Sequence, residues 1–327
     1  MADSNKIEQY RVKFVAHLEA RTKLAEPRNL YEPIQYILGL GGKRLRPVLT
    51  LMTAELFGGK MDDAMDAALA IEMFHNFSLV HDDIMDDAPL RRGKTTVHEK
   101  WDVNTGILSG DAMLILAYQF FESYPPKTFQ ELTRLFSQTA IEVCEGQQYD
   151  VDFESREDVT IAEYLKMIEY KTSVLVAAAM KMGAIVANAP SKDAEAVYEF
   201  GKNLGIAFQL QDDFLDAFGD PETFGKQVGG DIIENKKTFL YLKSLEMATK
   251  EQQESLLHLY SIKPTDAGSK VETVKSIFEE SGVVGTTKEA IHKYTQKAFD
   301  TLEGMTLSQT GKQLLRQFGE NLMQRTV

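Results

Sequence analysis

Two short stretches of the chain carry aspartates whose spacing suits a divalent cation. In each stretch the first, second and fifth positions of a five-residue segment are aspartate: Asp82, Asp83 and Asp86 in one, and Asp212, Asp213 and Asp216 in the other. On a helix the first and fifth side chains lie one turn apart on the same face, where like charges repel. Mg²⁺ prefers carboxylate and phosphate oxygens and would relieve that repulsion. One such segment is often only a solvated helix end, but a second with the same spacing favours a metal site.

Basic residues lie close in sequence to both aspartate clusters. Arg91 and Arg92 follow the first cluster, and Lys226, Lys236 and Lys237 follow the second. Guanidinium groups pair with phosphate oxygens through parallel hydrogen bonds. The pattern therefore indicates a phosphate-bearing ligand that is held by metal and cations together.

A glycine-rich loop at residues 39–47, GLGGKRLRP, carries three more cations and opens a helix. Backbone amides at a helix N-terminus, with Lys43, Arg44 and Arg46 beside them, favour an anion. The alternative is that the glycines end a helix and the arginines lie on the surface. Lys171, next to a long apolar stretch, likewise either reaches solvent or meets an anion, because an unpaired buried charge costs much free energy.

Helical periodicity positions these residues throughout the chain, and no convincing alternating strand pattern interrupts it. The expected helices are 6–23, 30–38, about 46–57, 62–87, 104–122, 128–149, 161–189, 191–216, 239–249, 252–259, 270–281, 288–304 and one ending near 323, with a loop at 152–160. With 327 residues and few prolines, we expect one all-α domain spanning 1–327.

The helix at 62–87 has one face that suits a cavity wall. At 100° per residue, His75, Ser78, Asp82 and Asp86 fall on one side and Phe77 points well away. We therefore expect a cavity whose mouth holds the metal.

Composition excludes several classes of partner. The net charge of −13 argues against a general nucleic-acid or anionic-membrane surface. The most apolar stretch, 173–189, is short and interrupted by Lys181, so it predicts a buried helix and not a membrane span. The single cysteine, Cys144, fits a reducing compartment and is expected in the core. Residues 1–14 lack the apolar run of a signal peptide, so we expect a cytoplasmic protein.

Six motifs together resemble the trans-type (all-E) isoprenyl diphosphate synthases, which include the farnesyl and geranylgeranyl diphosphate synthases. They are GGKRLRP at 41–47, DDIMD at 82–86, RRG at 91–93, GQQYD at 146–150, KTS at 171–173 and FQLQDDFLD at 208–216. The similarity spans about residues 30–240. It implies the isoprenoid synthase type I fold, a single large helical bundle around a central apolar cavity, and a homodimer.

The resemblance also implies a reaction. An allylic diphosphate ionises, its cation alkylates isopentenyl diphosphate, and loss of a proton gives a product one C5 unit longer, with departing diphosphate as the base. Two to three Mg²⁺ ions bind Asp82, Asp86 and Asp212, with Asp83, Asp213 and Asp216 as direct or indirect ligands. By the same resemblance, isopentenyl diphosphate would bind Lys43, Arg46, His75 and Arg92. The allylic diphosphate would bind Arg91, Lys171, Lys226 and Lys236. The side chains near the developing cation would be those of Lys171, Thr172 and Gln209.

The sequence departs from the family pattern in two loops. Thr95 stands where the family usually has proline, and Asn235 stands where it usually has glycine before Lys236. The sequence Phe239-Leu-Tyr replaces the common leucine-proline-leucine.

Product length depends on the wall beneath the first cluster. In the family, bulky residues four and five positions before the first aspartate shorten the product, and here these are Ser78 and Phe77. Phe74 lies two turns below Asp82, about 12 Å away, and is the alternative floor. We predict a C20 product, geranylgeranyl diphosphate, with C15 farnesyl diphosphate as the alternative.

Two other classes of protein share parts of this pattern. A class I terpene cyclase has one aspartate-rich helix but no use for an isopentenyl diphosphate site, so incorporation of labelled isopentenyl diphosphate separates the two. A non-catalytic subunit of a heteromeric synthase typically lacks one aspartate motif, and this chain has both.

Overall fold

The chain is almost entirely helical in the part that the structure describes. The computed structural model describes residues 2–220 and 229–324, with the side chains of residues 2–5 excepted. The regular structure outside helices is one small hairpin of β1 (Leu90–Arg91) and β2 (Lys94–Thr95). The predicted all-α class is therefore confirmed.

The chain divides into two units. Unit 1 comprises Met1–Ala140 and Ala178–Tyr198, and unit 2 comprises Ile141–Ala177 and Glu199–Val327. Three helices contribute residues to both units: α7 (Pro126–Ser155), α9 (Val174–Val186) and α10 (Ser191–Phe218). The single domain spanning 1–327 stays a prediction.

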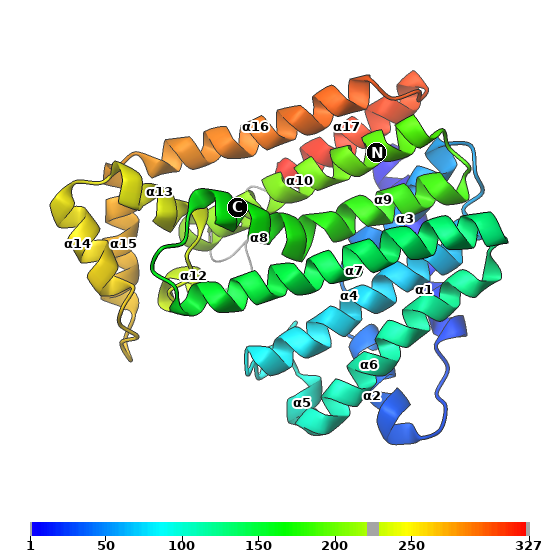
Figure 1. Ribbon diagram of the computed structural model, residues 1–327, viewed down its shortest axis with the longest axis horizontal. Helices are drawn as coiled ribbons and strands as arrows, with labels where there is room; N and C mark the ends of the chain where they lie inside the picture. Colours follow the sequence, from blue (N-terminus) through cyan, green and yellow to red (C-terminus); the bar gives the residue numbers. More distant parts are fainter. Residues whose placement is uncertain (1, 221–228, 325–327) are drawn as a thin grey trace. The chain divides into compact units, whose positions relative to one another are not determined.

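Unit 1 is organised around α4 (Met65–Met85), the helix that carries the first aspartate cluster. The other elements of this unit are α1 (Ala2–Arg21), α2 (Arg28–Gly39), α3 (Leu45–Leu56), η1 (Asp62–Ala64), α5 (Val97–Lys100), α6 (Val103–Gln119) and η2 (Phe120–Ser123). Helices α1, α2, α3, α5 and α6 all pack against α4 (Figure 1). Because neighbours surround it, α4 is buried on most of its circumference from Met65 to Phe77.

The apolar stretch at 173–189 forms a buried helix, as predicted. In unit 1, a Cβ at Gly183 would lie 2.2 Å from the Thr50 carbonyl oxygen, so only glycine allows this approach of α9 to α3. The charge of Lys181 is paired, because its amine donates a hydrogen bond to the exposed carboxylate of Glu195. None of the described helices combines the length and the apolar character that a membrane span requires.

Unit 2 contains the second aspartate cluster near the C-terminal end of α10. Its other elements are α8 (Ile161–Ile168), the π-helical turn η3 (Glu169–Ser173), α12 (Gly230–Ile233), α13 (Phe239–Met247), α14 (Lys250–Leu259), α15 (Gly268–Glu280), α16 (Val283–Glu303) and α17 (Gln309–Met323). Helix α13 packs against α8, α14, α15 and α16, and α14 lies beside α15 (Figure 1). Tyr164, Leu210, Leu240 and Phe278 belong to one apolar core.

The small elements were missed by the sequence analysis. Helices α5 and α12 have four residues each, too few to show helical periodicity. The β1–β2 turn places Arg92 (φ 53°) and Gly93 (φ 71°) in the left-handed region, the geometry of a type I′ hairpin. Helix α7 continues to Ser155, so the predicted loop at 152–160 begins later than expected.

The prediction that Cys144 belongs to the core is wrong. Its side chain is exposed on α7, although its neighbour Val143 and nearby Gly146 are buried. One helical residue rotates the side-chain direction by 100°, so an apolar neighbourhood in sequence does not assign each member to the core.

Candidate active site

The first aspartate cluster lies at the C-terminal end of α4. Asp86 is exposed, Asp82 is half-buried and Asp83 is only 1% exposed. Both carboxylate oxygens of Asp83 accept hydrogen bonds of 2.8 Å from Nε of Arg91. The predicted metal residues therefore share one helix end, and the β1–β2 hairpin brings Arg91 directly to the middle aspartate.

Three of the four residues predicted for isopentenyl diphosphate lie together in unit 1. Arg46 Nη1 is 3.2 Å from His75 Nε2. Arg92 donates a hydrogen bond to the carbonyl of Gly41. A Cβ at Gly42 (φ +119°) would lie 2.9 Å from the Arg92 guanidinium carbon, so glycine lets the guanidinium lie against the loop.

The charges in this group repel one another. Burial lowers the pKa of Arg46 to about 10, and the Arg92 charge acts in the same direction. Burial holds the pKa of His75 well below its usual value, and the charges of Arg46, Arg92 and Arg91 add to that effect. His75 is therefore neutral near pH 7, and an anion would relieve the repulsion between the arginines. Lys43, the fourth predicted residue, is exposed on the same loop.

Arg44 does not belong to an exposed anion site. Its guanidinium is buried, where it forms a 2.5 Å ion pair with Glu72 and donates a hydrogen bond to the Leu38 carbonyl. A left-handed backbone (φ 50°) immediately before α3 accompanies this inward position. The expectation that all three cations of the loop serve an anion is wrong for Arg44, because Glu72 on α4 neutralises it.

The second aspartate cluster crowds carboxylates together in unit 2. Asp213 is buried and accepts hydrogen bonds from the Tyr164 hydroxyl and from Gln209 Nε2, the latter at 2.8 Å. Burial raises the pKa of Asp213 to about 6; its two hydrogen bonds oppose the shift, while the charges of Asp212 and Asp216 add to it.

Asp231 joins this cluster and was missed by the sequence analysis. Its backbone N–H donates to Asp216 Oδ2 at 2.9 Å. Burial raises the pKa of Asp231 to about 8, and the charges of Asp213 and Asp216 act in the same direction. A Cβ at Gly230 would lie 3.2 Å from Asp216 Oδ1, so the glycine before Asp231 is the one sequence feature that could have indicated its place. No feature of the sequence indicated that Tyr164 would contact Asp213.

Oxygen donors crowded in this way suit Mg²⁺. Neighbouring carboxylates raise one another's proton affinity when no cation separates them, and the charges of Asp212 and Asp216 add in this way to the burial that raises the pKa of Asp213. Magnesium takes hard oxygen ligands and usually only one or two carboxylates per ion. The donor set of the second cluster therefore fits the ion.

The KTS segment forms the π-helical turn η3. Lys171 Nζ donates to Asp150 Oδ2 at 2.5 Å, and Thr172 Oγ1 lies 3.4 Å from Gln209 Oε1. A Cβ at Gly146 would lie 2.2 Å from the Lys171 backbone nitrogen, so glycine lets α7 pack against the widened turn. Single π turns are frequent at functional sites.

The lysine loop after the second cluster is described in part. Lys236 donates its backbone N–H to the Asp231 carbonyl at 2.8 Å, and Nζ lies 3.7 Å from Glu234. Asn235 has a left-handed backbone (φ 64°), which explains why glycine would serve at this position. Its side chain also accepts a hydrogen bond from the buried amine of Lys270, a contact that glycine lacks. Lys226 lies outside the described residues.

Comparison with known proteins decides the family. The family model described as Polyprenyl synthetase matches residues 27–280. The chain belongs to the polyprenyl synthetase family. A geranylgeranyl diphosphate synthase from Methanosarcina mazei is 41% identical over 238 residues, which are 72% of this chain and 73% of that protein. A geranylfarnesyl diphosphate synthase from Natronomonas pharaonis is 35% identical over 319 residues, 92% of this chain and 91% of the relative.

A solved structure of a geranylgeranyl pyrophosphate synthase is similar over almost the whole chain. It is 55% identical, with a TM-score of 0.94, and covers 98% of this chain and 99% of that chain. Members of the polyprenyl synthetase family are prenyltransferases that use Mg²⁺, so this chain is a transferase of that family.

The residues predicted to limit product length lie on α4. Phe74 is 1% exposed, and its ring packs 5.4 Å from Phe77 and 5.2 Å from Phe136 between centroids. Phe77 also packs 4.8 Å from the ring of His81. Ser78 is half-buried and donates its hydroxyl to the His75 carbonyl at 2.9 Å. The two phenylalanines therefore form one aromatic cluster with Phe136 of α7.

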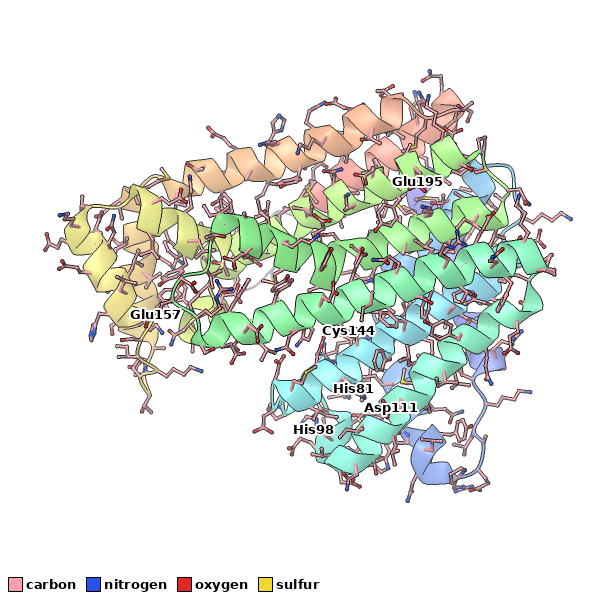
Figure 2. The ribbon with its side chains drawn as sticks, viewed as in Figure 1. His81, His98, Asp111, Cys144, Glu157 and Glu195 are labelled. Atoms are coloured by element: carbon pink, nitrogen blue, oxygen red, sulfur yellow. The ribbon has the colours of Figure 1, made fainter. Side chains whose placement is uncertain are left out.

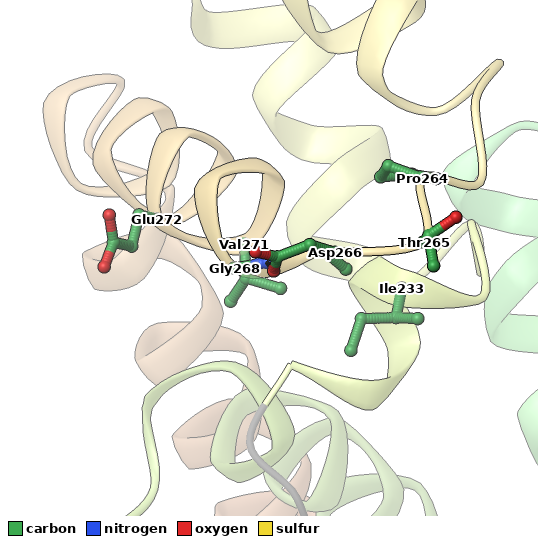
Figure 3. A pocket seen from close by; sticks show the side chains of 8 residues that line it. Ile233, Pro264, Thr265, Asp266, Gly268, Val271 and Glu272 are labelled. Carbon is green, nitrogen blue, oxygen red and sulfur yellow. Dashed lines mark hydrogen bonds between the residues drawn. The ribbon is translucent and has the colours of Figure 1, made fainter.

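Unit 2 also contains a pocket. It is open between α12 and the loop that leads into α15, and Figure 3 shows its lining. The lining residues are Ile233, Pro264, Thr265, Asp266, Ala267, Gly268, Val271 and Glu272. No residue predicted for the polyprenyl synthetase site is among them.

Proposed function

We propose that this polyprenyl synthetase condenses isopentenyl diphosphate with dimethylallyl, geranyl and farnesyl diphosphate, and that its main product is geranylgeranyl diphosphate. The observation that carries the proposal is the group of Arg46, His75 and Arg92, because a terpene cyclase has no use for a second diphosphate site. The family membership and the two aspartate clusters support the same reaction.

The isopentenyl diphosphate site would work by charge and by a neutral imidazole. Arg46 and Arg92 repel each other in the free protein, so a bound diphosphate gains from both charges. His75, held neutral by burial, donates or accepts one hydrogen bond without adding charge. These groups would fix the isopentenyl double bond for attack, and positioning of this kind contributes a large part of catalysis.

The allylic diphosphate would bind beside the aspartates. Asp82, Asp86 and Asp212 would hold Mg²⁺, which when bound stabilises the negative charge of the leaving diphosphate. Asp83, Asp213 and Asp216 complete the two acidic groups. The cations that grip the diphosphate would be Arg91, Lys171, Lys226 and Lys236.

Lys171, Thr172 and Gln209 would act near the allylic carbon. Lys171 and Thr172 lie on the π turn η3, and Gln209 of α10 links Thr172 to Asp213. Hydroxyl and amide oxygens aimed at a developing cation stabilise it without capturing it. The departing diphosphate would take the proton that ends each condensation.

A C25 product is the second candidate, because the geranylfarnesyl diphosphate synthase from Natronomonas pharaonis aligns with 92% of the chain. A C20 product is favoured by the geranylgeranyl diphosphate synthase of Methanosarcina mazei and by the solved geranylgeranyl pyrophosphate synthase.

The test is a product assay. The purified protein is incubated with labelled isopentenyl diphosphate, Mg²⁺ and each allylic primer in turn, and the chain length is read by chromatography. We expect label in a C20 product from all three primers. Unlabelled cyclic hydrocarbons from the allylic primer alone would contradict the proposal, and a dominant C15 or C25 product would replace its chain length.

Two substitutions test whether side chains of α4 limit the length of the product. Ser78→Phe is expected to shorten the product by one C5 unit, and Phe74→Ala to lengthen it, because the first adds and the second removes bulk on α4. Phe121→Ala removes another buried ring that contacts Phe136 and is the matched control. If Ser78→Phe and Phe74→Ala both gave the product distribution of the native chain, these residues would not limit chain length.

We also propose a homodimer. Helix α6 exposes four aliphatic side chains on one face: Val103, Ile107, Leu108 and Ile115, at 47%, 41%, 60% and 58%. Exposed apolar faces of this kind mark contact surfaces. Light scattering should give a dimer for the native chain and a monomer for the Leu108→Glu, Ile115→Glu variant; a monomeric native chain would contradict the proposal.

A further inference from the structure

His98 in α5 is buried without a hydrogen-bond partner. Its side chain is 4% exposed, and neither ring nitrogen has a hydrogen bond to any group among the described residues. A buried polar group left in this way costs about 1–3 kcal/mol, so each case needs an explanation such as a bound water or ion. None of the roles proposed for the active site uses His98.

Two carboxylates face this imidazole. One ligand atom each from Asp87, His98 and Glu99 lies within 4.8 Å of the other two. His98 Nε2 is 3.8 Å from Glu99 Oε1, beyond hydrogen-bond distance. Ligands bound to zinc at about 2.0–2.2 Å in tetrahedral geometry lie about 3.4 Å apart, so small rotations of the two exposed carboxylates would suffice.

The backbone holds the three ligands in place. Thr96 Oγ1 donates to the Ala88 carbonyl at 2.8 Å, and the Thr96 N–H donates to Pro89 at 3.1 Å. These bonds tie the end of α4 to the start of α5. Asp87 has a left-handed backbone (φ 48°) where glycine or asparagine is common, and its carboxylate is thereby placed beside α5.

We infer that Asp87, His98 and Glu99 bind one divalent transition-metal ion of the zinc class, with water at the fourth position. Imidazole together with carboxylates suits Zn²⁺ better than Mg²⁺. The site shares no residue with the two aspartate clusters, and it differs from them by adding an imidazole to the carboxylates. Because it joins α4 to α5, the bound ion closes the hairpin loop that carries Arg91 and Arg92.

A second histidine in the same unit shows what the site requires. His81 Nε2 already lies 3.2 Å from the Ile107 carbonyl, and its nearest carboxylate, Asp111, is 4.0 Å away. It therefore has one carboxylate and a competing hydrogen bond, whereas His98 has two carboxylates and none. Figure 2 labels His81, His98 and Asp111, and Asp111→Asn is the matched control.

The experiment counts bound zinc on the full-length protein with Mg²⁺ in excess, so that the aspartate clusters are occupied. We expect one tightly bound Zn²⁺ per chain after gel filtration, and a rise in Tm on adding Zn²⁺. Asp87→Asn, Glu99→Gln should weaken zinc binding at least about 100-fold, since even the loss of an indirect partner costs 10–100-fold. Asp111→Asn should bind zinc as the native chain does.

Imidazole ligation has its own readout. With Cu²⁺ as the probe, electron paramagnetic resonance should show nitrogen coupling in the native chain and lose it in folded His98→Gln. If His98→Gln fails to fold, the exposed Asp87→Asn, Glu99→Gln variant should still abolish the coupled signal. Equal zinc affinity in the native and double-variant chains, or no zinc bound in excess Mg²⁺, would overturn the inference. Neither result would affect the proposed synthase activity, which is measured with Mg²⁺ alone.

Discussion

The two aspartate clusters have the same spacing, but their middle aspartates have different partners. Asp83 in unit 1 accepts two hydrogen bonds from the charged Arg91. Asp213 in unit 2 accepts from the uncharged Tyr164 and Gln209. A cation compensates a buried carboxylate directly, whereas neutral donors leave the cost of desolvation dominant, which is why the pKa of Asp213 rises to about 6.

This difference separates the roles of the two clusters. In the first cluster the charge of the buried middle aspartate is compensated by Arg91 before any ligand arrives. The second cluster, with Asp231 added, holds excess negative charge that protons or metal must relieve. Identical spacing therefore predicts where carboxylates lie on a helix, and the surrounding partners decide how they respond to pH and metal.

The largest expected effect comes from the outer aspartates. Asp82→Asn and Asp212→Asn should each lower kcat/KM at least about 10³-fold, because each removes a proposed magnesium ligand needed by the leaving diphosphate. Incorporation of labelled isopentenyl diphosphate measures it. Glu251→Gln, exposed on α14, is the control and should retain native activity. Near-native activity in Asp212→Asn would show that only the first cluster serves the metal.

Replacing each middle aspartate should lower the stability of the protein by a different amount. Asp83→Asn leaves Arg91 facing a neutral group, and we expect a loss of about 1–3 kcal/mol in the free energy of unfolding, less than for a fully buried pair because Arg91 is partly exposed. Asp213→Asn keeps an acceptor for Tyr164 and should cost about 1 kcal/mol or less. Urea unfolding without metal compares them; a greater loss in Asp213→Asn would reverse the comparison.

The second cluster should make metal-free stability depend on pH. The folded pKa of Asp231, about 8, exceeds its ordinary value, so the folded state binds the proton more tightly. This contribution is fully present below the ordinary aspartate pKa and is lost as pH rises through about 8. The Tm should therefore fall as pH rises from about 4 to about 8, and Asp231 contributes part of that fall. In Asp231→Asn that part of the fall should disappear; an unchanged pH dependence would contradict the assignment.

The smallest expected effect concerns one hydroxyl. Tyr164→Phe removes a hydrogen bond that lowers the pKa of Asp213, so that pKa should rise above about 6. Mg²⁺ affinity near pH 6 should weaken by about 2–5-fold, because a proton then competes with the metal for Asp213. Near pH 8 the affinity should recover, because Asp213 has lost that proton. Calorimetric titration at both pH values measures it. Tyr260→Phe, a tyrosine of unit 2 stacked on Tyr241, should leave both affinities unchanged.

Much of the candidate site could be predicted from short-range patterns in the sequence. The aspartate spacing, the cations after each cluster and the helical class needed only helical geometry and charge. Asp231, Tyr164 and Glu72 could not be predicted in the same way, because each reaches its partner through packing of segments distant in sequence. The four-residue helix α5, which carries His98, was likewise too short to show a period.

By itself the sequence determined the all-α class, the family and the spacing of the carboxylates, since these depend on local periodicity and on motifs of a few residues. Only the tertiary structure decided which charges are compensated. It paired Arg44 with Glu72 and Arg91 with Asp83, surrounded Asp213 with neutral donors, and left His98 buried beside two carboxylates. The physical reason is that desolvation and Coulomb energy depend on neighbours in space, and a spacing along the chain does not specify them.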